Sequence, residues 1–116
     1  MKDYRNLFVW KISHVLVLRI YALTASFPKS ELFGLSGQIR RAAASVPANI
    51  AEGCGRYGDA ELKRFINIAL GSACELDYHA LLATDLGYWS PEEGQSLAAD
   101  IMSIRRMLGS LIKRLK

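Results

Sequence analysis

The residues after position 90 constrain the fold most, because a helix start signal precedes a long apolar seam. In Ser90-Pro91-Glu92-Glu93, serine occupies a helix N-cap, proline the first helical position, and glutamate the third residue after the cap, which makes a capping box. The apolar residues that follow alternate in steps of four and three: Leu97, Ile101, Ile104, Leu108, Leu111 and Leu115. This a/d spacing predicts a helix that packs along one face.

Three further segments have helical periodicity, and none has the alternation typical of a strand. The predicted helices span about residues 7–26, 36–53 and 59–86, with Ser36 and Asp59 as N-caps. The middle of the first is apolar nearly all the way round, which favours burial on more than one side. Because the connections are short, the sequence predicts an all-α, up-down-up-down antiparallel four-helix bundle, with residues 1–116 as one domain.

Composition narrows the class of protein further. The chain has 116 residues, of which 51% are hydrophobic, a mild excess that favours a self-associating protein. The longest apolar run, residues 15–18, ends at Arg19 and cannot cross a bilayer. Without an apolar signal segment near the N-terminus, we expect a cytoplasmic protein that makes no membrane contact.

The stretch from Arg40 to Arg56 is the most unusual in composition. Pro47 lies inside a helical pattern and predicts a kink, because it removes one amide donor. A structural interpretation has Asn49 bonding to freed backbone groups, while Glu52 pairs with Arg56 and Gly53 begins a glycine-rich turn. A functional interpretation makes Asn49, Glu52 and Arg56 a polar contact site. Both remain open from the sequence.

No familiar catalytic or metal-binding pattern appears. His14 and His79 lie on different predicted helices without neighbouring ligand residues, so we expect structural or surface roles. Cys54 and Cys74 are predicted to be free thiols, because a helix separates them by more than a disulfide allows. We therefore expect a protein that is not an enzyme and needs no cofactor or metal.

Charge is distributed unevenly along the chain, whose formal net charge is +4. In an up-down-up-down bundle, residues 1–11, 45–64 and 105–116 meet at one end, where they hold eleven basic and four acidic groups. The opposite end includes Arg19 and Lys29 but is acidic overall. Seven cations are candidate phosphate contacts: Arg56, Lys63, Arg64, Arg105, Arg106, Lys113 and Arg114. Dipole complementation of the last helix would explain part of this pattern, but not the cations between 56 and 64.

Several segments resemble one family along most of the chain. The segments that carry the resemblance are Leu7-Phe8-Val9-Trp10-Lys11, Gln38-Ile39-Arg40-Arg41-Ala42, Val46-Pro47-Ala48-Asn49-Ile50-Ala51-Glu52-Gly53 and Ala69-Leu70-Gly71-Ser72. They are similar to the four-helix bundle protein family, also called the 23S ribosomal RNA intervening-sequence protein family. At Ala48 the family commonly has serine, so any role of that hydroxyl is absent here.

The resemblance implies a small bacterial four-helix bundle that assembles as a ring-like homopentamer. It also implies two kinds of partner, because some relatives bind nucleic acid and the reverse transcriptase of diversity-generating retroelements. Two hypotheses follow for this chain. One is a non-enzymatic oligomer that binds RNA or DNA phosphates through the basic bundle end. The alternative is a protein scaffold, or an accessory subunit of a nucleoprotein or a reverse transcriptase.

Overall fold

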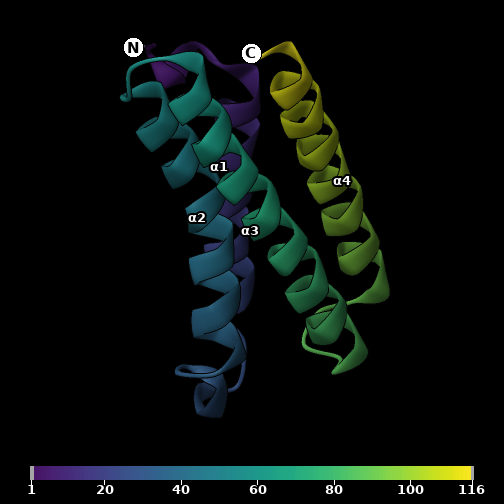
Figure 1. Ribbon diagram of the computed structural model, residues 1–116. Helices are drawn as coiled ribbons and strands as arrows, with labels where there is room; N and C mark the ends of the chain where they lie inside the picture. The colour runs from purple at the N-terminus through teal and green to yellow at the C-terminus, as the bar shows by residue number, and fades with distance from the viewer. Residues whose placement is uncertain (1, 116) are drawn as a thin grey trace.

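The computed structural model describes residues 2–115, and in that range it shows a bundle of α-helices and no strand. The helices are α1 (Phe8–Thr24), α2 (Leu35–Cys54), α3 (Asp59–Asp85) and α4 (Pro91–Arg114), with short 3-10 helices η1 (Tyr4–Asn6) and η2 (Lys29–Glu31). Successive helices run in opposite directions (Figure 1). The predicted all-α, up-down-up-down four-helix bundle is therefore confirmed.

Both ends of the described chain lie at the same end of the bundle as the α2–α3 turn. Figure 1 shows the N and C labels beside that turn, whereas the α1–α2 and α3–α4 connections lie at the far end. The backbone N–H of Lys2 donates to the carbonyl of Cys54 at 2.8 Å, which ties the N-terminal segment to the end of α2. The predicted meeting of three distant segments at one end is thus present.

The core forms where α2, α3 and α4 pack, and the a/d seam supplies its α4 side. All six seam residues are buried: Leu97, Ile101, Ile104, Leu108, Leu111 and Leu115. The helix α1 packs more extensively on α2 than on α4. Its outer face is exposed, since Val15 and Leu18 retain 63% and 57% of their accessible surface. Burial of α1 on more than one side is therefore not completed within one copy of the chain.

The start of α2 differs from the sequence prediction. Ser36 is buried inside the helix, and the N-cap position belongs to Gly34, which has no side chain to cap with. The carboxylate of Glu31 replaces the missing cap, because it accepts the backbone N–H of Leu35 at 3.0 Å. The other oxygen of Glu31 accepts the hydroxyl of Tyr88 at 2.8 Å. These two donors lower the pKa of Glu31, with the backbone bond as the larger cause.

Protonation of Glu31 should therefore lower the free energy of unfolding of the protein. Because its folded-state pKa is lowered, its stabilising contribution is present above the ordinary glutamate pKa of about 4.3 and is lost as pH falls below that value. Urea unfolding measures how far the free energy of unfolding falls between pH 7 and acid pH. We expect this fall to be smaller in Glu31→Gln than in wild type. A matched Glu92→Gln variant, at an exposed carboxylate, should keep the wild-type pH dependence. An unchanged pH dependence in Glu31→Gln would contradict this role.

The starts of α3 and α4 show which cap signals were correct. Asp59 is the first helical residue of α3 rather than its cap, and Gly58 precedes it with a φ of 85°. At α4 the hydroxyl of Ser90 accepts the backbone N–H of Glu93 at 3.0 Å, as predicted. A full capping box would also have the backbone N–H of Ser90 donating to the Glu93 carboxylate. Among residues 2–115 this bond does not form, because the Glu93 carboxylate binds Arg19 of α1 instead.

Arg19 holds α1 against the first three turns of α4. Its guanidinium contacts Glu93 and also donates to the carboxylate of Asp100 at 2.8 Å and the hydroxyl of Ser96 at 2.9 Å. These three acceptors lie on one face of α4, at spacings of three and four residues. From the sequence, Arg19 was placed only as one of the charges of the opposite end. In the structure it also bridges two helices.

Candidate nucleic-acid interface

The side chains of the unusual stretch from the middle of α2 to the α2–α3 turn make mostly local contacts. Pro47 is buried inside the helix. The side-chain amide of Asn49 donates to the Ser45 carbonyl at 2.8 Å and to the Ser45 hydroxyl at 2.9 Å. The carbonyl freed by proline would be that of Ala43, four residues earlier, so Asn49 bonds near Pro47 but not to the freed group. The predicted pair of Arg56 with Glu52 is confirmed at 2.9 Å.

The α2–α3 turn packs two arginines onto one aromatic ring. The guanidinium carbons of Arg56 and Arg64 lie 5.2 Å and 4.4 Å from the ring centroid of Phe65. Phe65 is itself only 7% exposed, because it packs beside Gly53 of α2. A buried ring therefore holds two predicted phosphate contacts beside each other through cation–π contacts.

Both of these arginines also have carboxylate partners. Arg64 pairs with Glu61 at 3.0 Å, as Arg56 does with Glu52. The hydrogen bond from Arg64 lowers the pKa of Glu61, and the same bond raises the pKa of Arg64. All four side chains are substantially exposed, so the pairs are weak and can exchange partners with a phosphate.

Three other predicted contacts at this end are cations without a carboxylate partner. Lys63 is half-buried, while Lys113 and Arg114 are exposed in the last turn of α4. Within residues 2–115, none of the three lies within 4.0 Å of a carboxylate oxygen. Lys116, counted in the predicted cluster, falls outside the described residues. We define Arg56, Lys63, Arg64, Lys113 and Arg114 as the basic end.

Arg105 and Arg106 lie further along the bundle than the end itself. At 1.5 Å per residue, they precede the last residue of α4 by about 12–14 Å. Arg105 is 3.8 Å from Asp77 of α3, so part of its charge is balanced there. Arg106 is exposed and extends the basic end down the side of α4.

Each histidine contacts a neighbouring side chain of its own helix, and the two cysteines are not joined to each other. His79 shares a 3.0 Å hydrogen bond with Glu75, which lowers the pKa of Glu75, while His14 stacks on Trp10. Both cysteines are free, as predicted, and burial raises the pKa of the Cys54 thiol. The described part of the chain contains no group of three potential metal ligands. Nor does any helix within it have the length and apolar character needed to span a membrane.

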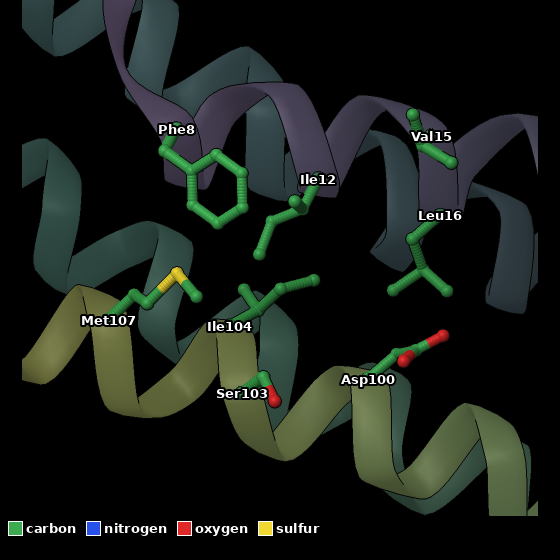
Figure 2. A pocket seen from close by; sticks show the side chains of 8 residues that line it. All are labelled: Phe8, Ile12, Val15, Leu16, Asp100, Ser103, Ile104 and Met107. Atoms are coloured by element: carbon green, nitrogen blue, oxygen red, sulfur yellow. The ribbon is translucent and has the colours of Figure 1, made fainter.

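A groove separates α1 from α4, and most of the side chains that line it are apolar. Figure 2 shows Phe8, Ile12 and Leu16 pointing from α1 toward α4, with Ile104 and Met107 pointing back. The groove holds about 370 Å³. Phe8 is 65% exposed at its rim. Sequence periodicity did not reveal the groove, because the separation of two helices depends on packing along the whole bundle.

Comparison with known proteins agrees with this fold. Residues 5–110 match the family model described as 23S rRNA-intervening sequence protein. The chain is also similar to a crystal structure from Bacteroides thetaiotaomicron, described as a protein with unknown function from the S23 ribosomal protein family. The two are 30% identical, with a TM-score of 0.81 over 90% of this chain and 98% of that one. A search of curated proteins finds no significant match.

Proposed function

The chain belongs to the 23S rRNA-intervening sequence protein family, and we propose that it is a non-enzymatic homo-oligomer that binds nucleic acid through its basic end. The observation that carries this proposal is the set of unpaired cations at the end of the bundle where the α2–α3 turn and the C-terminal turn of α4 lie. Lys63, Lys113 and Arg114 have no carboxylate within ion-pair distance among residues 2–115, although acidic residues are available elsewhere in the bundle. Unpaired cations gathered at one end attract a polyanion and release its counterions on binding.

The arginines on Phe65 add directional hydrogen-bond donors to this charge. A guanidinium can give two parallel N–H bonds to one phosphate, which a lysine cannot do. Binding would exchange the partners of Arg56 and Arg64 from Glu52 and Glu61 to phosphate oxygens. Because these contacts are made to the phosphates of the nucleic acid and not to its bases, we expect little preference for base sequence.

Self-association would combine several basic ends on one particle. The exposed apolar residues of α1 support it, since Phe8 and Val15 flank a groove whose floor is also apolar. We propose that a second copy of the chain covers this groove, and the number of five copies comes from the family resemblance alone.

A non-catalytic role fits Cys54, because its raised pKa disfavours the nucleophilic thiolate.

The experiment compares binding of purified protein to labelled RNA, single-stranded DNA and duplex DNA at low salt. Lys113→Gln/Arg114→Gln should weaken binding to all three, since it removes two exposed cations without breaking an ion pair. The control is Lys29→Gln/Arg41→Gln, which removes two exposed cations away from the basic end. It breaks only the exposed pair of Arg41 with Glu75, 2.7 Å apart, and should retain binding. Arg19 is unsuitable as a control because it joins α1 to α4.

Two results would contradict the proposal. If no polyanion binds at low salt, the protein is not a nucleic-acid-binding protein, and the scaffold hypothesis replaces it. If both double variants lose affinity equally, the basic end has no special role, and binding reflects overall charge alone.

A further inference from the structure

A second groove, between α1 and α2, is lined by aromatic rings on one side and small residues on the other. Tyr4, Trp10 and His14 form the aromatic wall, and Ala44, Pro47 and Ala48 form the opposite one. The groove is shallow and holds about 300 Å³. Small residues on α2 leave the aromatic wall open to a flat ligand, since no long side chain among those lining the groove covers it.

The three rings form a continuous row. Trp10 and His14 are stacked nearly parallel, with centroids 5.1 Å apart and an interplanar angle of 7°. Tyr4 meets Trp10 edge-on, with centroids 4.8 Å apart and an angle of 61°. His14 is exposed, whereas Tyr4 and Trp10 are half-buried and therefore held in place. Such a row presents aromatic surface in a fixed orientation.

One arginine lies at the Tyr4 end of this row, and another lies about two turns of α1 beyond His14. Arg5 lies over the ring of Tyr4 at 4.7 Å, and Arg40 lies over Tyr21, one turn beyond the groove, at 4.8 Å. Arg40 donates to the hydroxyl of Thr24 at 2.7 Å, and no carboxylate in the described chain pairs with it. Arg5 is only loosely paired, at 3.7 Å from Asp3. No carboxylate lines the groove itself.

We propose that this groove is a stacking site for single-stranded nucleic acid, an inference that rests on the proposed function and specifies its ligand. An unpaired base stacks on the exposed His14 ring at the end of the Trp10–His14 stack, and Arg5 and Arg40 contact the phosphates on either side. Aromatic rings flanked by cations are the combination that binds single strands without sequence preference. In a duplex, the base faces are already stacked on one another and cannot enter.

The dimensions fit a short run of nucleotides. Trp10 and Tyr21 are separated by three turns of α1, or about 16 Å. The N-terminal end of the row lies at the same end of the bundle as the α2–α3 turn, so one strand can follow the groove toward the basic end (Figure 1). The groove would supply base contacts, and the basic end would supply further phosphate contacts.

The test measures fluorescence anisotropy with three labelled probes: an oligothymidylate of about twelve nucleotides, an abasic phosphodeoxyribose strand of the same length, and a duplex. All three carry phosphates, but only the first offers unstacked bases. Wild-type protein should bind the oligothymidylate between about fivefold and a hundredfold more tightly than the abasic strand. Binding should also quench the fluorescence of Trp10.

Two variants locate the effect. Trp10→Leu keeps an apolar side chain in the half-buried position and should abolish the preference for the strand that has bases. Tyr78→Leu removes an exposed aromatic ring of α3 outside the groove and should preserve that preference. If Trp10→Leu does not fold, the comparison of normal and abasic strands on wild-type protein still decides the proposal.

The outcomes separate this proposal from the proposed function. Equal affinity for normal and abasic strands would overturn the stacking site and leave phosphate binding at the basic end intact. A preference that survives in folded Trp10→Leu would also overturn it. Failure of every probe to bind would overturn both the stacking site and the proposed function.

Discussion

Replacing Gly53 by alanine should destabilise the protein by about 1–3 kcal/mol, whereas the same change at Gly71 should stabilise it by up to about 1 kcal/mol. An added Cβ at Gly53 would lie 2.8 Å from the Cβ of Phe65 and 3.1 Å from a methyl carbon of Leu62. The Cβ of Phe65 is fixed to the α3 backbone, so α2 and α3 must separate to accept the new methyl group. At Gly71, no side-chain or tertiary atom lies within 4 Å, and alanine is the better helix former.

Urea unfolding of both variants measures this difference directly. The opposite signs matter more than either magnitude, because they come from the same chemical change at two helical positions. A displaced Phe65 would also move the ring on which Arg56 and Arg64 rest, so Gly53→Ala should weaken nucleic-acid binding as well. Equal stability of Gly53→Ala and wild type would show that the close approach of α2 and α3 does not depend on glycine.

Val15→Lys should dissociate the assembly and weaken nucleic-acid binding by about a hundredfold or more. Val15 is 63% exposed at the α1–α4 groove, so a lysine there should leave the fold of one copy unchanged. In an interface between copies, the same lysine would be buried. The carboxylate that lines the groove, Asp100, already binds Arg19, so the buried lysine is costly. Separated copies lose the gain of about 10²–10⁴ that linked binding sites give.

The direction of this effect is informative because the substitution adds a positive charge. If total charge governed binding, Val15→Lys would bind more tightly than wild type. Leu32→Lys, at an exposed leucine of the α1–α2 connection, adds the same charge away from the groove and should remain assembled. Light scattering should report about 12.9 kDa for Val15→Lys. A wild-type protein that is already monomeric, or a variant of unchanged mass, would contradict the proposed assembly.

The number, order and direction of the helices could be predicted from the sequence because the signals involved are local. The a/d seam of α4, the Ser90 cap and the glycines after α2 and α3 lie within a few residues of the structure they specify. The N-cap predicted for α2, Ser36, was wrong because the group that caps this helix is not part of a local sequence signal. Glu31 reaches Leu35 from the preceding 3-10 helix and is also held by Tyr88, a contact across 57 positions that no local pattern contains.

The candidate site was predictable as a region but not in its details. Chain direction alone places residues 56–64 and the C-terminus at one end. Which cations are free depends on the register between helices, as the contact of Arg105 with Asp77 shows. The role of Arg19 and the row of rings beside Trp10 depend on how α1 lies against α4 and α2. Both became apparent only from the packed structure.

The salt dependence of binding tests the central claim most directly. For wild-type protein, log K should fall linearly with log salt concentration, with a slope of about −0.7 per phosphate contacted on a single strand. Lys113→Gln/Arg114→Gln should make that slope shallower by about 0.7 for each phosphate contact removed, while Lys29→Gln/Arg41→Gln should leave it unchanged. An identical slope for wild type and the basic-end variant would contradict nucleic-acid binding through this end.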